Sequence, residues 1–185
     1  RITNRVRTDE GLAYTAGSVF RQRVEYPGDF LAYFFSKSST VPLATRTVFE
    51  ELEKIRDKPV KPEELTTVKQ NLILTCPRTF ESKAGTLAVF VNDEWTGRDP
   101  SYWQNFRDNV NKVGVEDVER VAKEHLDPSK MAVLIVGDWE AISAGNSNSE
   151  ADSNRVVTMQ DIQGGNATQI PPKDPVTLKP IGSGV

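Results

Sequence analysis

The sequence predicts an α+β fold in which strands and helices are segregated along the chain. Two apolar segments of strand character come first, five amphipathic helical segments follow, and one further apolar run ends the ordered pattern. This order differs from the strict alternation of strands and helices in doubly wound folds. The 185 residues are enough for one well-buried core and too few for two comfortable domains.

Residues 12–23 and 30–35 form the predicted strand pair. Alternation along the first segment places Tyr14 on the same face as Phe20. A strong turn pattern at residues 26–29 separates the segments. The second segment is aromatic or aliphatic throughout, which is typical of a strand buried on both faces. We therefore expect an antiparallel pair.

Five helices are predicted from apolar residues at helical spacing. Proline suits the first turn of three of them, and proline or glycine ends the first three. In the fifth, Gly114 is a permitted N-cap and Asp117 has the capping-box spacing. The positions expected to face inward are Val48, Leu52 and Ile55; Leu65, Val68 and Leu72; Ala84, Leu87, Ala88, Val91 and Trp95; Trp103, Phe106 and Val110; Val118, Val121 and Ala122.

The last third of the chain changes in character. Residues 131–136 are continuously apolar and predict a strand inside a sheet. The sequence then divides into a domain at residues 1–142, a polar loop at 143–155, and a C-terminal segment at 156–185. That segment begins with a short predicted edge strand, residues 156–161, and continues as a proline-rich extended tail.

Composition excludes several classes of protein. The net charge is −3 and basic residues are interspersed with acidic ones, so a nucleic-acid surface is not expected. No apolar run is long enough to span a membrane.

The single cysteine, Cys76, excludes an internal disulfide and a thiolate zinc site, and its place after an apolar helix predicts a buried, inert thiol. The chain starts with a pattern typical of a helix interior, so we expect a piece of a longer protein.

The residues alone do not assemble a catalytic centre. Hydrolytic zinc sites need three protein ligands, commonly two histidines and a carboxylate. The one histidine, His125, falls in the last turn of the fifth predicted helix, where a helix-end role is expected. We therefore expect no metal ligands and no bound cofactor in this chain. Composition and periodicity by themselves leave a soluble α+β domain without an assigned purpose.

One segment points to a family. Arg7-Thr-Asp-Glu-Gly-Leu-Ala-Tyr14 ends a predicted helix, turns at Gly11 and enters a strand. It resembles the Arg-x-x-x-Gly-Leu-x-Tyr pattern in the second half of insulinase/pitrilysin-type (inverzincin) zinc peptidases. The resemblance continues in order to about residue 138, through Lys61-Pro-Glu-Glu-Leu65, Lys69-Gln-Asn-Leu72, Phe80-Glu-Ser82, Val113-Gly-Val-Glu-Asp-Val118, Leu126-Asp-Pro128 and Val133-Leu-Ile-Val-Gly-Asp138.

The resemblance implies a fold and an assembly. Members of this family are clamshells of two similar halves, each a two-layer α+β sandwich with a mostly antiparallel sheet and helices packed on one face. The first half carries zinc, the His-x-x-Glu-His motif and the catalytic glutamate, and the second half closes over the peptide. Residues 1–142 would then be an N-terminally truncated second half, inactive alone. Its partners would be the zinc-bearing half, on the same chain or another subunit, and a peptide or unfolded polypeptide substrate. Similarity to exported bacterial members favours the periplasm.

The same resemblance implies roles for two residues. Arg7 would bind the substrate backbone, since a guanidinium offers several fixed donors to carbonyl oxygens. Tyr14 would donate a hydrogen bond to the scissile carbonyl or its developing oxyanion. Without the family pattern, Arg7 reads as an exposed helix charge and Tyr14 as a strand aromatic that packs on Phe20 or Phe30. Lys61 departs from the pattern, because it stands where a capping hydroxyl is usual.

Two other functions fit the sequence. Some relatives of this fold are zinc-less partner subunits or structural proteins without a direct catalytic role. The chain could also be a stand-alone module that binds peptides along an exposed strand edge.

Overall fold

The computed structural model describes residues 1–145, 156–162, 166–171 and 173–181. Both predicted strands of the pair and all five predicted helices are present. The main elements are η1 (Thr3–Asp9), β1 (Ala13–Arg21), β2 (Asp29–Ser36), η2 (Ser38–Thr40), α1 (Val41–Asp57), α2 (Pro62–Thr75), η3 (Cys76–Phe80), α3 (Lys83–Thr96), α4 (Tyr102–Lys112), α5 (Val115–His125), η4 (Pro128–Lys130), α6 (Trp139–Ala144) and η6 (Met159–Asp161).

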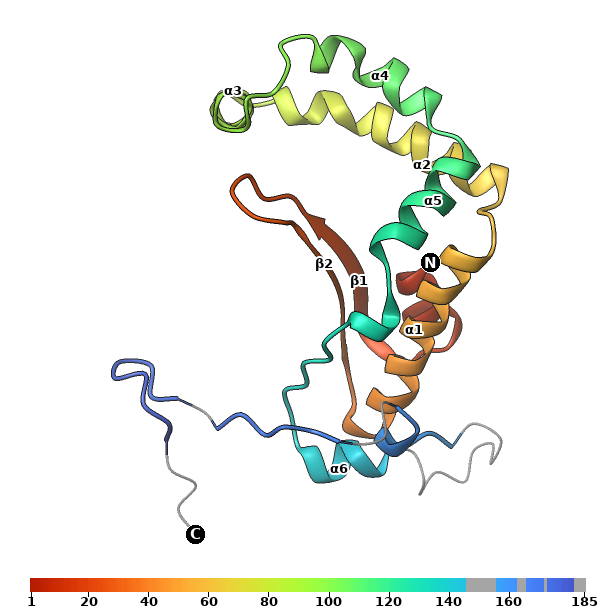
Figure 1. Ribbon diagram of the computed structural model, residues 1–185, viewed down its shortest axis with the longest axis vertical. Helices are drawn as coiled ribbons and strands as arrows, with labels where there is room; N and C mark the ends of the chain where they lie inside the picture. Colours follow the sequence, from red (N-terminus) through yellow and green to blue (C-terminus); the bar gives the residue numbers. More distant parts are fainter. Residues whose placement is uncertain (146–155, 163–165, 172, 182–185) are drawn as a thin grey trace.

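The β1–β2 hairpin and the helices that pack on it confirm the α+β class. The strands are antiparallel, with Ala13 opposite Ser36 and Phe20 opposite Phe30. Helix α1 runs along the inner half of the hairpin, α5 packs against α1, and α2–α4 stand beyond the hairpin's outer end (Figure 1). In the described residues no helix is both long enough and apolar enough to cross a bilayer.

The hairpin is covered on one face, so the expectation that residues 30–35 are buried on both faces is wrong. Phe30, Ala32 and Phe34 pack on the core. The alternate residues Tyr33 and Phe35 are 43% and 67% exposed. Helices cover only the first face, and a two-stranded sheet has no second layer to bury the other. Continuous apolarity was therefore not evidence of two-sided burial.

Residues 131–136 run extended, but they do not form the predicted interior strand. They pair with no strand in the described parts of the chain. Leu134 and Val136 are 80% and 92% exposed, whereas Met131 and Ile135 pack beside the core. A strand needs a hydrogen-bonded neighbour, and a local apolar run cannot specify one.

The short edge strand predicted at residues 156–161 is also absent. Residues 159–161 form the 3₁₀ turn η6, in which the Asp161 carboxylate accepts from the amide of Thr158 at 2.8 Å. Val157 and Met159 are buried in a second apolar cluster with Leu43 of α1. A turn in which both Val157 and Met159 are buried is therefore present where the alternating strand was predicted. Helix α6, which was not predicted, includes residues of the expected polar loop, and residues 146–155 of that loop lie outside the described residues.

The main core lies between α1, η1 and the hairpin. Its buried members are small or aliphatic: Ile2, Val6, Ala13, Ala16, Ala44, Val48 and Leu52. Predicted inward positions of α1 are therefore confirmed for Val48 and Leu52. The stripe of α3 is different, because Leu87, Val91 and Trp95 are 64%, 61% and 66% exposed. Helix α3 contacts η3, and its buried residue is Val89.

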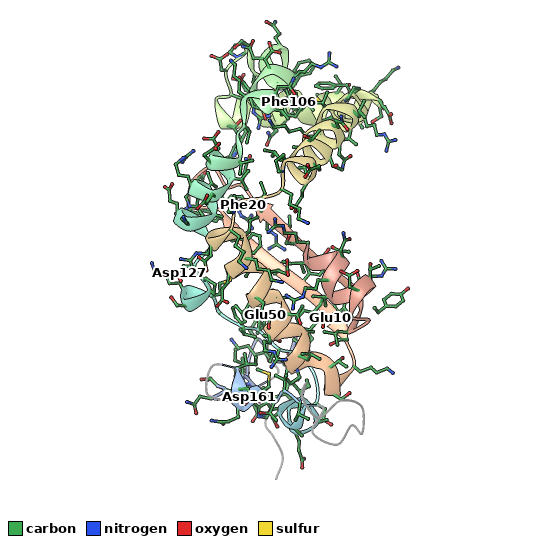
Figure 2. All side chains as sticks on the ribbon, turned by 90° about the vertical axis from the view of Figure 1, so that its right-hand side faces the viewer. Glu10, Phe20, Glu50, Phe106, Asp127 and Asp161 are labelled. Carbon is green, nitrogen blue, oxygen red and sulfur yellow. The ribbon has the colours of Figure 1, made fainter. Side chains whose placement is uncertain are left out.

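Arg5 of η1 donates hydrogen bonds to three carboxylates, two of which are on α1. Its guanidinium donates to Glu51 at 2.9 Å, to Glu10 at 3.1 Å and to Glu50. Figure 2 shows Glu10 and Glu50 on the two elements that face each other here. Burial opposes the charge on Arg5, but the hydrogen bonds that Arg5 donates to Glu50 and Glu51 outweigh this effect and raise the pKa of Arg5. Burial likewise opposes the Glu51 charge, and hydrogen bonds from Lys54 and Arg5 nevertheless lower the pKa of Glu51.

Glu51→Gln should remove part of the acid sensitivity of this chain. The folded pKa of Glu51 is depressed, so its contribution is present above the unfolded pKa, about 4.3, and is lost as pH falls through the folded value. We expect the variant to lose about 1.5–3 kcal/mol at neutral pH, the usual contribution of hydrogen bonds to charged groups. Urea unfolding at neutral and acidic pH measures both effects. An unchanged pH dependence in the variant would contradict this assignment.

Candidate functional site

The segment from Arg7 to Tyr14 is a helix end, a glycine turn and the start of a strand, as predicted. Helix η1 has the wide π-helical repeat, and Arg7 lies in its last turn. Gly11 has φ +61°, in the left-handed region that costs a residue with a Cβ about 1–2 kcal/mol. The amide of Leu12 donates to the carbonyl of Val6 at 2.9 Å and closes the turn.

A β-bulge at Tyr14 decides the direction of its side chain. Ala13 is opposite Ser36 and Thr15 is opposite Phe35, so Tyr14 is an extra residue without a partner position on β2. Regular alternation is broken here: Ala13 and Ala16 are both buried, and Tyr14 is 86% exposed. The expected sharing of one face by Tyr14 and Phe20 assumed an unbroken strand. Bulges often re-aim a side chain beside functional sites.

The side chain of Arg7 differs from that of Arg5 in its exposure and in its hydrogen-bond partners. Arg5 is held by three carboxylates, whereas Arg7 is exposed. Within the described parts of the chain, neither Arg7 nor Tyr14 has a hydrogen-bond or ion-pair partner. At 86% exposure the Tyr14 ring does not pack on Phe20 or Phe30, so the packing alternative is wrong. The π-helix end and the bulge thus present a free guanidinium and a free phenol seven residues apart.

The residues do not fit a zinc ion. Among the described residues, no group of three histidine, cysteine, aspartate or glutamate side chains could hold a metal. His125 is the last residue of α5, as predicted, and its Nε2 lies 3.7 Å from Glu124. Cys76 is a free, half-buried thiol rather than a buried one.

A second feature is an apolar pocket at the outer half of the hairpin. It has a volume of about 740 Å³ and lies between the outer half of the hairpin and α5. Phe20 and Phe30 line one wall, and Val118 and Val121 line the other. Neither Arg7 nor Tyr14 contributes to it. The pocket is therefore separate from the candidate site.

Comparison with known families bears on this segment. Residues 1–72 match the family described as the peptidase M16 inactive domain. The match includes η1, the bulge, the hairpin and α1, and hence both candidate residues. No curated protein matches the chain.

Two solved structures share the fold of this chain over about two thirds of its length. A protease from Helicobacter pylori is 19% identical, with a TM-score of 0.56 over 69% of this chain and 30% of its own. A peptidase M16 inactive domain from Pseudomonas fluorescens is 21% identical, with a TM-score of 0.53 over 68% of this chain and 30% of its own. This chain thus spans about 30% of the length of either structure.

Sequence reasoning selected Arg7 and Tyr14 as candidate site residues but missed the bulge that exposes Tyr14. The bulge has no local pattern, because it depends on the register between β1 and β2. The carboxylate cluster around Arg5 was also missed. Its only signal is the pair Glu50-Glu51 on a predicted helix, 45 and 46 residues away from Arg5.

Proposed function

We propose that this chain is the substrate-binding, non-zinc half of an M16-type metalloendopeptidase, in which Arg7 and Tyr14 act on a peptide held against a separate zinc-bearing half. The observation that supports the proposal is that Arg7, at the end of η1, and Tyr14, at the bulge, are both exposed and have no side-chain partner in the described residues. The family match over residues 1–72 supports the same assignment. Substrate is a peptide or unfolded polypeptide, and the periplasm is the proposed compartment.

The two residues have different tasks. The Arg7 guanidinium binds backbone carbonyls of the peptide in the ground state, with donors fixed by its planar geometry. The Tyr14 hydroxyl donates to the scissile carbonyl oxygen, where negative charge grows during attack. Zinc and the general base, on the other half, supply the activated water. This chain alone has no hydrolytic activity.

Arg7→Met should weaken peptide binding in the complete peptidase. Loss of charged hydrogen bonds, worth about 1.5–3 kcal/mol, predicts a fall in kcat/KM of about 10- to 100-fold. Most of it should come from a higher KM, because Arg7 binds ground state and transition state alike. Steady-state hydrolysis of a fluorogenic peptide measures the split.

Arg107→Met is the matched control. Arg107 is another exposed arginine, on α4, and it has no ion pair in the described part of the chain. Its variant should retain the kinetics of the native chain. Equal losses in both variants would show that net charge, and not the Arg7 position, is responsible, and no loss in Arg7→Met would remove Arg7 from the site.

A zinc-less subunit of the same fold is the alternative within the family. In that case both the Arg7 and the Tyr14 variants would assemble and hydrolyse normally. A stand-alone peptide-binding module is favoured by one observation, since each strand of the two-stranded sheet has an unpaired edge in the described residues. Such a module would bind extended peptides without the zinc half and independently of Arg7.

A further inference from the structure

Backbone geometry sets the direction of the Tyr14 side chain. The ring is 86% exposed, and its hydroxyl has no hydrogen-bond partner in the described residues. Contacts of the ring itself therefore do little to fix it. The position of the phenol depends on the turn at Gly11 and on the bulge, so the residues that hold this turn bear on the proposed chemistry.

Glu10 begins this turn, and two hydrogen bonds connect it to Arg5. The amide of Glu10 donates to the carbonyl of Arg5 at 3.0 Å, which closes the wide π-helical repeat of η1. Arg5 Nε donates to the Glu10 carboxylate at 3.1 Å, and the Glu10 side chain is 15% exposed. Arg5 thus binds both the backbone and the side chain of the residue that precedes Gly11.

Arg5 is itself fixed to α1. Its other two guanidinium nitrogens donate to Glu51 at 2.9 Å and to Glu50, which are adjacent on α1. The Glu51 side chain is 9% exposed, and Lys54 donates to the same oxygen at 2.7 Å. Glu10 and Glu50 lie close together in Figure 2. A single planar guanidinium therefore sets the distance between the end of η1 and the core helix α1.

The three carboxylates around Arg5 require a cation between them. Glu10, Glu50 and Glu51 all accept hydrogen bonds from one guanidinium, and carboxylates at such spacing repel one another. Lysine in place of Arg5 keeps the charge but not the three fixed donor directions. We expect lysine to retain one or two of these contacts, so the end of η1 would no longer be held at one distance from α1.

Strand β1 has contacts of its own beyond the bulge. The Thr3 hydroxyl donates to the carbonyl of Ala16 at 2.9 Å, and regular pairing with β2 runs from Ala16 to Arg21. These bonds do not involve Arg5. Loss of the Arg5 contacts should therefore move the turn and Tyr14 while the hairpin stays folded.

We infer that Arg5 is a positioning residue for Tyr14, and that it acts through Glu10 by holding the turn at a fixed place on α1. The inference rests on the proposed function, in which the Tyr14 hydroxyl donates to the scissile carbonyl oxygen. A catalytic group misplaced by about 1 Å can cost on the order of 100-fold in rate. The contacts of Arg5 therefore matter to turnover although its guanidinium is occupied by carboxylates.

Kinetics of the complete peptidase test whether Arg5 acts through Tyr14. Arg5→Lys should lower kcat by about 10- to 100-fold. In a chain that already carries Tyr14→Phe, Arg5→Lys should lower kcat by less than about twofold, because the donor that it positions is gone. A purely structural role of Arg5 would lower kcat by the same factor in both backgrounds.

Arg46→Lys is the matched control. Arg46 lies 3.7 Å from the same Glu50 carboxylate, and this ion pair lies within α1. Its variant makes the same substitution beside the same carboxylate without altering η1, so kcat should stay native. Glu10→Gln is a second variant, which leaves Arg5 bound to α1, and it should lower kcat with the same dependence on Tyr14.

Hydrogen exchange followed by mass spectrometry is a measurement that does not depend on activity. In the same complete peptidase, a peptide covering residues 8–14 should exchange faster in Arg5→Lys than in the native protein. The reason is that the amides of Glu10 and Leu12 close the turn. Exchange of this peptide should be native in Arg46→Lys.

Each outcome decides the inference. Native kcat with native exchange in both Arg5→Lys and Glu10→Gln would overturn it and leave the proposed function standing. An equal loss of kcat with and without the Tyr14 hydroxyl would also overturn it, because Arg5 would then support only the fold. Faster exchange in Arg5→Lys together with native kcat in Tyr14→Phe would instead remove the proposed function, and with it the role assigned to Arg5.

Discussion

Tyr14→Phe is expected to lower kcat of the complete peptidase by about 100- to 1,000-fold, the usual effect of removing one donor to a developing oxyanion. The ring remains and only the hydroxyl is lost, so packing is not at issue, particularly at 86% exposure. KM should change little, because the hydroxyl is used mainly in the transition state. Steady-state kinetics with a defined peptide separates the two parameters.

Tyr33→Phe provides the matched control for this prediction. Tyr33 is a second tyrosine of the same hairpin, 43% exposed, and it lies opposite Gly17 in regular register. Its hydroxyl should be dispensable for turnover. If Tyr14→Phe has native kcat, or if it raises KM alone, then Tyr14 has no role in the chemical step and the proposed mechanism loses its donor.

The confirmed elements were those encoded locally. Five helices have apolar spacing with proline or glycine at their ends, and the amide of Gly114 does donate to Asp117 at 2.9 Å, as the capping box predicts. The turn at Gly11 is likewise a local requirement for positive φ. Each of these depends on residues fewer than about four positions apart, where backbone geometry decides.

The missed features depend on residues far apart in the sequence. The bulge at Tyr14 follows from the pairing register between β1 and β2. Whether residues 131–136 form a strand depends on whether another strand lies beside them. Periodicity also identifies an apolar stripe on α3 without saying what covers it, and Leu87 is 64% exposed. Arg7 and Tyr14 were selected as candidates because a spacing pattern includes them, whereas the exposure of Tyr14 at a bulge was not predictable from that pattern.

Leu52→Ala should be among the most destabilising single changes in the chain. Leu52 is 3% exposed in the core formed by α1, η1 and the hairpin. Truncating a buried leucine removes its transfer free energy and leaves a cavity, which together cost about 2–5 kcal/mol. Because this core supports both η1 and β1, the segment that carries Arg7 and Tyr14 should unfold with it. Urea unfolding followed by circular dichroism measures the loss.

Leu134→Ala makes the comparison informative. Leu134 lies in the run that the sequence assigned to a sheet interior, yet it is 80% exposed. A surface truncation of this kind changes stability by no more than about 0.5 kcal/mol. Similar losses for Leu52→Ala and Leu134→Ala in the 185-residue chain would place residues 131–136 inside a sheet. A large loss for Leu52 alone locates the stabilising core beneath the bulge, where the phenol and the guanidinium are held.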